Sequence, residues 1–290
     1  MEIKHTLQKL PKNTFEISVI LGWKSVKEAY DEAFEKAVGE AEVEGFRKGK
    51  APRPLAEKQI NKDTVYQKAI EQLVPKIYEE VVKNEDLKPV VSPKIELTSA
   101  NENEDWQLKF TVATRPEVKL GDYKKVVDEL KSKHKKADIW VPGKDKEKDQ
   151  RHDVESKQKL LNEILTELLK SSQVEIADLI LEEEVNMRLT RLLDEIAKIG
   201  LTVEAYLKSK NLTMDVLKQQ LRKEIEETHK LEFILNEIAD KEQIQVDPQE
   251  LEKLFASITD QAERTAAHQN SYFYAALLRK QKTLDFLTTL

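Results

Sequence analysis

The sequence predicts an α+β domain, an antiparallel four-stranded sheet with helices, followed by an all-α open helical domain with arm-like projections. Apolar residues alternate with a period of two near Phe15 and again near Trp106, whereas spacings of three and four dominate after Asp153. The length of 290 residues suits about two domains of ~150 residues each. We therefore expect a first domain over residues 1–115, a charged linker over 116–152 and a helical domain over 153–290.

The first domain should begin with two paired strands. Phe15, Ile17, Val19 and Leu21 alternate with mostly polar neighbours, which indicates a half-buried strand. The segment 2–10 can pair with it through a turn at residues 11–13. The period then changes to that of a helix, with one apolar stripe along Val26, Ala29, Tyr30, Ala33, Phe34, Ala37, Val38 and Ala41.

A second helical stretch begins near Pro54, breaks around 61–62 and resumes over 63–83. Because its apolar stripe continues beyond Pro75, we expect that proline to kink the helix rather than end it. Two further strands are predicted over 90–97 and 106–114. Two strands, two helices and two strands in this order predict an antiparallel sheet covered by helices.

Residues 116–152 are predicted to be a linker because their charge is dense and their apolar periodicity is weak. Between Lys131 and Arg151 there are eight basic and four acidic residues. Such a stretch buries too little apolar surface to offset the conformational entropy lost on ordering. We allow for a short ordered piece around Ile139–Val141.

The helical domain carries apolar stripes and clear helix boundaries. One stripe runs from Leu160 to Leu169, and the next ends where Gly200 is expected at the C′ position. Thr202 and Thr213 are candidate N-caps. The run Asp247-Pro248-Gln249-Glu250 is a stronger start signal, with a capping acid, proline at the first helical position and an acid at N3.

The composition excludes several classes of protein. With 54 acidic and 48 basic residues the net charge is −6, which disfavours a globally basic nucleic-acid binder. The absence of cysteine excludes disulfide scaffolds and thiolate chemistry, and seven glycines disfavour phosphate-cradling loops. No secretory signal or membrane-spanning stretch is visible, so we expect a cytoplasmic protein without membrane contact.

We expect no catalytic residue, metal site or cofactor. His5, His134, His152, His229 and His268 are scattered, with no pair at helical ligand spacing. The consecutive acids 182–184 splay around a helix and are expected on a solvated face, since they cannot form a paired acid–base site. The Ser, Thr and Tyr residues show no nucleophile motif.

The most informative segment joins the two N-terminal helices and reads Gly-Phe-Arg-Lys-Gly-Lys-Ala-Pro over residues 45–52. Its glycines and proline break the helix, and basic residues surround Phe46. One interpretation is a docking tip, in which the aromatic enters an apolar cleft while the cations neutralise phosphates or acids. The other is a solvated turn in which Phe46 folds back onto the core, and the residues alone leave both open.

This segment resembles the signature loop of the trigger factor family, bacterial chaperones that dock at the ribosomal exit tunnel. Residues 87–90, 115–123, 182–185 and 277–287 are also similar to that family. The resemblance covers roughly residues 1–130 and 150–290. It implies ribosome contact through Phe46, Arg47 and Lys48, supported by Gly45, Gly49 and Lys50, with a tunnel-exit ribosomal protein and ribosomal RNA as partners.

One departure from the family is large. Typical members carry an inserted prolyl isomerase domain after the Leu-Gly-Asp-Tyr segment, where this chain has only the charged residues 124–153. Such a domain needs about 100 residues. We therefore predict that the chain has no isomerase active site, although the family association suggests one.

The helical half is expected to bind unfolded nascent polypeptides without ATP, through shallow apolar surface dispersed among polar groups. Most of its apolar residues pack helix on helix. Arm-like projections are expected over 213–239 and 247–265. The alternative function is a ribosome-binding assembly or RNA-interaction factor, and a weak homodimer of the free chain is left open. The residues expected to face a client are Leu251, Leu254, Phe255, Ile258, Tyr272, Tyr274, Leu277 and Leu278.

Overall fold

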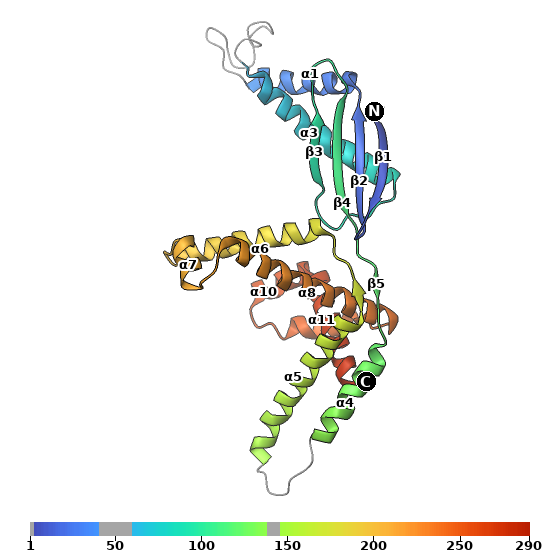
Figure 1. Ribbon diagram of the computed structural model, residues 1–290, viewed down its shortest axis with the longest axis vertical. Helices are drawn as coiled ribbons and strands as arrows, with labels where there is room; N and C mark the ends of the chain where they lie inside the picture. The colour runs from blue at the N-terminus through green and yellow to red at the C-terminus, as the bar shows by residue number, and fades with distance from the viewer. Residues whose placement is uncertain (1–2, 41–59, 138–145) are drawn as a thin grey trace. The chain divides into compact units, whose positions relative to one another are not determined.

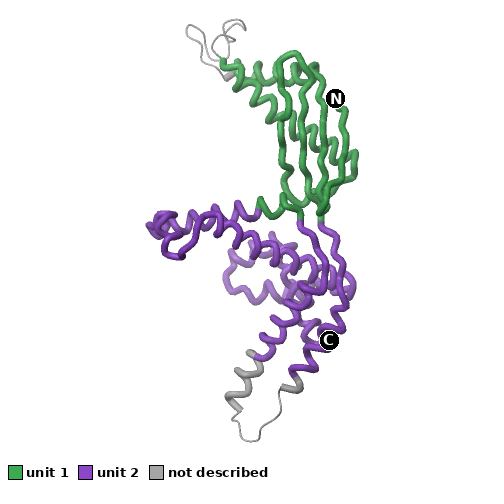
Figure 2. Tube along the Cα trace, viewed as in Figure 1, with its two compact units in different colours: residues 1–115, 177–183 green, residues 116–176, 184–290 purple. Residues whose placement is uncertain are grey.

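The computed structural model describes residues 3–40, 60–137 and 146–290. It divides into two compact units, which Figure 2 shows in different colours. The first comprises residues 1–115 together with 177–183, and the second comprises 116–176 and 184–290. The chain first passes from one unit to the other after Arg115, and it returns to the first unit over residues 177–183, which is not visible in the sequence.

The first unit is built on a four-stranded antiparallel sheet with the order β1-β2-β4-β3 (Figure 1). Its strands are β1 (Ile3–Leu10), β2 (Thr14–Leu21), β3 (Lys94–Ser99) and β4 (Trp106–Ala113). In the central pair Ile17 lies opposite Phe110 and Val19 opposite Leu108, and all four side chains are buried. The period-two alternation therefore places one apolar face against the helices, as predicted.

Helices α1 (Trp23–Glu40) and α3 (Lys62–Asn84) pack on each other and supply the other half of the core. The side chain of Asn61 caps α3 by accepting a hydrogen bond from the backbone N–H of Asp63 at 2.8 Å. Pro75 lies inside α3, which continues to Asn84, so the prediction that this proline does not end the helix is confirmed. The predicted helical stretch over 54–60 and the end of the α1 stripe at Ala41 lie outside the described residues, apart from Ile60.

The third strand begins later than predicted, at Lys94 instead of Val90. Pro93 has no backbone N–H to donate to a ladder, so it separates β3 from the isolated bridge between Pro89 and Thr114. Ile95 and Leu97 lie opposite buried residues of β4, yet are 46% and 43% exposed because β3 is an edge strand.

The second unit is mostly helical, and its core forms where α5, α8 and α11 pack together. Ile164, Leu168, Ile234, Ile238 and Leu287 are almost completely buried there. Its elements are β5 (Val118–Lys119), α4 (Tyr123–Ala137), α5 (Lys146–Ser171), β6 (Gln173–Val174), α6 (Asp178–Lys198, of which 178–183 belong to the first unit), α7 (Val203–Ser209), α8 (Met214–Lys241), α9 (Pro248–Ala256), α10 (Gln261–Gln269) and α11 (Ser271–Thr289).

The expectation of an unstructured linker over 116–152 is wrong for the part that the structure describes. This segment contains β5, α4 and the start of α5, and α4 packs along α5 as a helical pair (Figure 1). Tyr123 and Val127 are buried, Val126 and Leu130 are half-buried, and together they make a narrow apolar stripe. The dense lysines hide this stripe in the sequence. Ile139–Val141 lies outside the described residues.

The predicted helix boundaries of the second unit are confirmed. Gly200 has φ +75°, and the backbone N–H groups of Gly200 and Leu201 donate to the carbonyls of Ala197 and Ile196, which is a Schellman motif. The hydroxyls of Thr202 and Thr213 cap α7 and α8. Asp247 and Glu250 form a complete capping box at α9.

Candidate functional site

The predicted ribosome-binding loop, Gly45 to Lys50, lies outside the described residues. The structure describes what flanks it. Helix α1 extends to Glu40 on one side, and the capped N-terminus of α3 at Asn61 begins on the other. The role of residues 45–50 and their contacts to a partner stay a prediction.

The predicted client-facing residues lie on α9 and α11 of the second unit, with Ile258 in the connection that follows α9. Together with α10, these helices are here called the α9–α11 cluster. These helices contact one another. Phe255 of α9 is only 2% exposed, and its ring lies 4.6 Å from the His268 ring and 5.5 Å from the Tyr274 ring, centroid to centroid. We therefore correct the assignment of Phe255: it is a core residue of the cluster, unable to touch a client without unfolding.

The other predicted residues divide into half-buried and exposed groups. Tyr272 and Leu277 are 89% and 53% exposed, and the neighbouring Phe273, which is not among the predicted residues, is 63% exposed. These two aromatic residues and one leucine lie in the N-terminal turns of α11, and we call them the aromatic end of α11. Three consecutive aromatics, 272–274, cannot all face one core, because successive helical residues point about 100° apart. The run of three aromatic residues in the sequence could therefore have indicated that Phe273 is exposed. The half-buried residues are Leu251, Leu254, Ile258, Tyr274 and Leu278.

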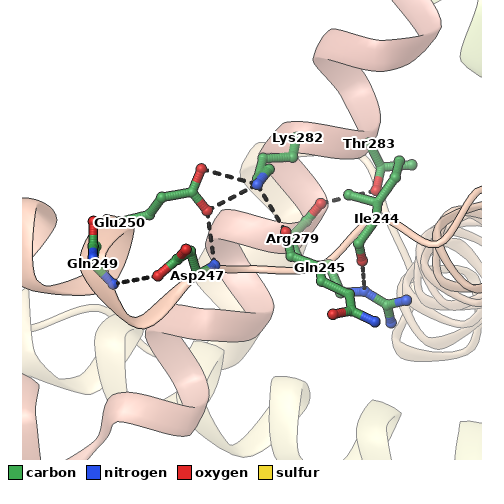
Figure 3. A network of polar contacts seen from close by, with 8 residues as sticks. All are labelled: Ile244, Gln245, Asp247, Gln249, Glu250, Arg279, Lys282 and Thr283. Carbon is green, nitrogen blue, oxygen red and sulfur yellow. Dashed lines mark hydrogen bonds and ion pairs between the residues drawn. The ribbon is translucent and has the colours of Figure 1, made fainter.

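A polar network fixes α11 against the segment that joins α8 to α9 (Figure 3). Lys282 donates to both carboxylate oxygens of Glu250, at 3.0 and 2.8 Å, and to the backbone carbonyl of Gln245 at 2.8 Å. Arg279 donates to the carbonyl of Ile244 at 2.8 Å and to Asp240 at 2.6 Å. The two cations thus bind backbone carbonyls of the segment between α8 and α9.

Glu250 has two roles in this network. It pairs with Lys282, and it accepts a hydrogen bond from the backbone N–H of Asp247 at 3.0 Å in the capping box. The hydrogen bond from Lys282, followed by that from Asp247, lowers the pKa of Glu250 below 4.5. The carboxylate is therefore charged at neutral pH and connects the start of α9 to α11.

A second polar connection joins α4 to the end of α8. The hydroxyl of Tyr123 donates to Glu242, and Lys124 pairs with the same carboxylate at 2.8 Å. Burial, and then the hydrogen bond to Glu242, raises the pKa of Tyr123 to about 12. The hydrogen bonds from Lys124 and Tyr123 lower the pKa of Glu242.

Further exposed apolar side chains surround α6 and the start of α8. Met187, Leu201 and Val216 are 43%, 46% and 40% exposed. Ile199, which the stripe pattern places among the packed residues of α6, is instead 69% exposed, because the chain turns away at Gly200 immediately afterwards. No motif marks these residues in the sequence, since an exposed and a packed isoleucine look alike in a periodic stripe.

Histidines within the described ranges pair with single carboxylates. His5 contacts Glu85 at 2.7 Å and His134 contacts Glu163 at 2.9 Å, and no group of three potential ligands that could hold a metal occurs among these residues. Glu182 is exposed and Glu183 and Glu184 are half-buried, so the three acids point in different directions. In the same part of the chain, every helix is too short or too polar to cross a bilayer.

Two family models match this chain almost end to end. The model described as bacterial trigger factor protein matches residues 3–140, and the one described as its C-terminus matches residues 145–288. The two matches leave residues 141–144 between them. The signature loop and the aromatic end of α11 lie within the first and the second match, respectively.

Similar proteins carry the same family name. The chain is 37% identical over 171 residues to a trigger factor of Shouchella clausii and 40% identical over 119 residues to one of Staphylococcus aureus. These stretches are 59% and 41% of this chain but 36% and 28% of the two relatives, so the chain spans about a third of their length.

A solved structure described as "Promiscuous Substrate Recognition in Folding and Assembly Activities of the Trigger Factor Chaperone" has the same fold. It superimposes with a TM-score of 0.66 and 17% identity, over 100% of this chain and 99% of that one. The α+β domain with its four-stranded antiparallel sheet and the helical domain after it are therefore those of a known architecture. Together with the two family models, this similarity shows that the chain belongs to the trigger factor family.

Proposed function

We propose that this protein is an ATP-independent chaperone that docks at the ribosomal exit tunnel and holds nascent polypeptides while they fold. Family membership supports the chaperone role. The observation that carries the client-binding part is the aromatic end of α11, where Tyr272, Phe273 and Leu277 are exposed on a helix fixed by Arg279 and Lys282.

An exposed apolar surface of this kind suits clients that share no sequence. Phe273 and Leu277 are four residues apart, so they lie on the same face of α11, and Tyr272 adjoins them. Such a surface can bind any apolar segment, because the binding free energy depends on the apolar area that is buried. It has no shaped pocket that would select one side chain. Binding is then weak enough for release without nucleotide hydrolysis, since affinity is tuned mainly through dissociation rates.

Ribosome docking is assigned to the loop that carries Phe46, Arg47 and Lys48. An aromatic side chain flanked by cations fits an apolar cleft beside phosphates or acidic side chains, which a ribosomal protein and ribosomal RNA at the tunnel exit present together. We expect the protein in the cytoplasm, with a weak homodimer as the form that hides the apolar surface off the ribosome.

One pelleting experiment tests the docking assignment. Wild type and the triple variant Phe46→Ala/Arg47→Ala/Lys48→Ala are centrifuged with ribosomes through a sucrose cushion. The variant should remain in the supernatant while its circular dichroism matches that of wild type. Equal co-sedimentation of the two proteins at the same salt concentration would show that the loop does not dock the protein on the ribosome.

A second experiment separates a chaperone from an RNA-interaction factor. An unfolded client is diluted from denaturant, and light scattering is followed with and without the protein. A chaperone suppresses the scattering without added ATP at about stoichiometric concentration, whereas an RNA factor leaves it unchanged. The loop variant serves as a control, because it should still suppress aggregation of a client in free solution.

We also propose that the chain lacks prolyl isomerase activity. An isomerase domain of about 100 residues has no place between the two family matches, which are separated by residues 141–144 alone. The α4–α5 pair occupies the position where typical family members carry that domain.

A further inference from the structure

The two edges of the sheet in the first unit differ in how well they suit the addition of another strand. β3 has six residues, starts directly after Pro93 and shifts register between Leu97 and Ser99. Short length, proline and a bulge are the usual protections of an edge strand. β1, at the other edge, has eight residues without proline or glycine and pairs with β2 in unbroken register from Ile3 to Leu10 (Figure 1). It is therefore the more regular template for a further strand.

A hydrogen bond at the start of β2 shows which backbone groups of β1 point outward. The N–H of Thr114, directly after β4, donates to the carbonyl of Asn13 at 3.0 Å. Across a trans peptide this carbonyl and the N–H of Thr14 point in opposite directions, so the N–H of Thr14 points toward β1. Thr14 lies opposite Leu10, and the hydrogen-bonding direction alternates along a strand. Leu10 and every second residue before it therefore face β2. The residues of β1 whose backbone groups point away from the sheet are Ile3, His5, Leu7 and Lys9.

This outward row of donors and acceptors has no partner in the part of the chain that the structure describes. No hydrogen bond within that part reaches the N–H or the carbonyl of these four residues. Leu7 lies opposite the buried Ile17, yet it is 37% exposed because no strand follows β1 in the sheet. The ring of His5 contacts Glu85 at 2.7 Å, which leaves its backbone groups unpaired. Unpaired backbone groups beside an exposed leucine are what an added strand needs.

The side chains of β1 give this edge unpaired positive charge. Lys4 and Lys9 are exposed, neither forms an ion pair with a described residue, and β1 contains no acid. The acids in contact with or opposite β1 are engaged: Glu85 by the histidine, and Glu16 of β2 by Lys109 at 3.2 Å. One lysine therefore stands near each end of β1 without a carboxylate partner among the described residues.

These charges distinguish between the strands that could add to β1. A second copy of this chain, paired through its own β1, would bring four unpaired lysines to one junction, and like charges on neighbouring strands destabilise pairing. Lysines on an edge also oppose a wholly apolar strand. A strand with an acid opposite each lysine is attracted, since opposite charges on neighbouring strands stabilise a sheet. Charge complementarity thus favours an acidic segment of another chain.

We propose that the free edge of β1 binds an extended, acid-containing polypeptide segment as a fifth, antiparallel strand of the sheet. Its backbone pairs with the outward groups of β1, which makes most of the affinity independent of sequence. Its acids lie opposite Lys4 and Lys9, and an apolar side chain lies beside Leu7. This site goes beyond the proposed client surface on α11, because it recognises extended backbone and charge instead of apolar area.

The first test measures whether the backbone of a bound peptide pairs with β1. A fluorescently labelled peptide, Glu-Thr-Val-Thr-Thr-Glu-Val, is titrated with the full-length wild type and followed by anisotropy. Aligned antiparallel with residues 9 to 3, it places its glutamates opposite Lys9 and Lys4. The N–H groups of its third and fifth residues then point toward β1, and those of its fourth and sixth point away. Methylation of the first pair of nitrogens should weaken binding about tenfold or more, and methylation of the second pair should change it less than about twofold.

The second test exchanges charges. Lys4→Glu/Lys9→Glu should bind the acidic peptide about tenfold more weakly than wild type at low salt, and should bind Lys-Thr-Val-Thr-Thr-Lys-Val more tightly than wild type does. Lys24→Glu/Lys62→Glu is the matched control, because it changes the net charge equally at exposed lysines of α1 and α3. This control should stay within about twofold of wild type for both peptides. Circular dichroism checks that both variants fold.

Several results would overturn the proposal. These are no rise in anisotropy with wild type, equal binding of the two methylated peptides, or equal binding of the acidic peptide by the Lys4→Glu/Lys9→Glu variant and its control. A wild-type dimer in sedimentation equilibrium that Leu7→Pro converts to a monomer would assign the edge to a second copy instead. Phe273→Ser/Leu277→Ser should bind the peptide as wild type does, and loss of binding in this variant would place the peptide on α11.

Discussion

The hydroxyl of Tyr123, at the start of α4, donates a hydrogen bond to the carboxylate of Glu242, the residue that follows the last turn of α8. The amines of Lys241 and Lys124 lie 5.3 and 5.9 Å from the centre of the Tyr123 ring. An aromatic ring, two cations and one carboxylate thus join two helices that are far apart in the sequence. The contact attaches α4, whose residues the sequence predicts to be a linker, firmly to the helical core.

Tyr123→Phe should destabilise the second unit by about 1.5 kcal/mol, because a buried hydrogen bond to a charged group is lost while Lys124 still pairs with Glu242. The midpoint of urea denaturation measures this change. The folded pKa of Tyr123 is raised to about 12, so its contribution is complete below pH 10 and is lost between pH 10 and 12. The difference in stability between wild type and variant should therefore shrink over that range, and a constant difference would contradict the assignment.

Gly121→Ala should be strongly destabilising. A Cβ atom at this position would lie 2.5 Å from the backbone carbonyl oxygen of Ser171, which cannot rotate away. Overpacking of this kind costs about 1–3 kcal/mol or more. Gly39→Ala is the matched control, because a Cβ there meets nothing within 4 Å inside α1 and should stabilise by about 0.5–1 kcal/mol. Thermal denaturation of the two variants should shift in opposite directions.

Glu250→Gln should weaken the attachment of α9 to α11 at neutral pH. The folded pKa of Glu250 is lowered, so its stabilising contribution is present above about pH 4.5 and is lost as the pH falls through the folded value. Denaturation at several pH values should show wild type more stable at pH 7, and the two proteins converging in acid. Lys280→Gln, which removes a charge from α11 that is not among the causes of the Glu250 shift, should not reproduce this pH dependence.

Substitutions in the α9–α11 cluster should separate folding from client binding. Phe255→Ala removes a buried ring and should cost about 3–5 kcal/mol. Phe273→Ser/Leu277→Ser changes exposed side chains and should alter stability by no more than about 0.5 kcal/mol, yet weaken suppression of client aggregation severalfold. Full suppression by the double variant would show that clients bind elsewhere. The next candidates would be the exposed apolar side chains of Met187, Ile199, Leu201 and Val216.

The proposed absence of isomerase activity gives a direct assay. The protein should not accelerate cis–trans isomerisation of a prolyl tetrapeptide above the uncatalysed rate. Without a catalyst the isomerisation takes tens to hundreds of seconds. A trigger factor that contains the isomerase domain is the positive control. Acceleration proportional to the concentration of this chain would show that an isomerase site exists.

The fold is largely predictable from the sequence because periodicity and capping are local. Strand pairing follows from the alternation in β2 and β4, and Thr202, Thr213 and Asp247 mark helix starts by their side-chain chemistry alone. The start of β3 is not predictable in this way, because the effect of Pro93 depends on which neighbour its missing N–H would have met. Helix α4 escapes prediction because its stripe of four apolar residues is narrow, and its burial depends on α5 and α8.

The candidate sites are less predictable, because exposure is a property of the assembled fold. Phe255 and Phe273 are both aromatic residues on helices of one cluster, and only the packing of α9, α10 and α11 makes one core and the other surface. The free edge of β1 depends on the strand order, in which β1 has β2 as its neighbour on one side. No single stretch of sequence contains that order.

The composition of the first unit also has a consequence for how the chain is made. Residues 177–183 belong to this unit, and Asp178 pairs with Lys12 of the β1–β2 turn at 3.0 Å. During synthesis from the N-terminus, residues 116–176 emerge before this last piece arrives. The first unit is therefore finished only after α5 has been translated, and a fragment ending at Arg115 would lack the closing segment with Ile180 and Leu181.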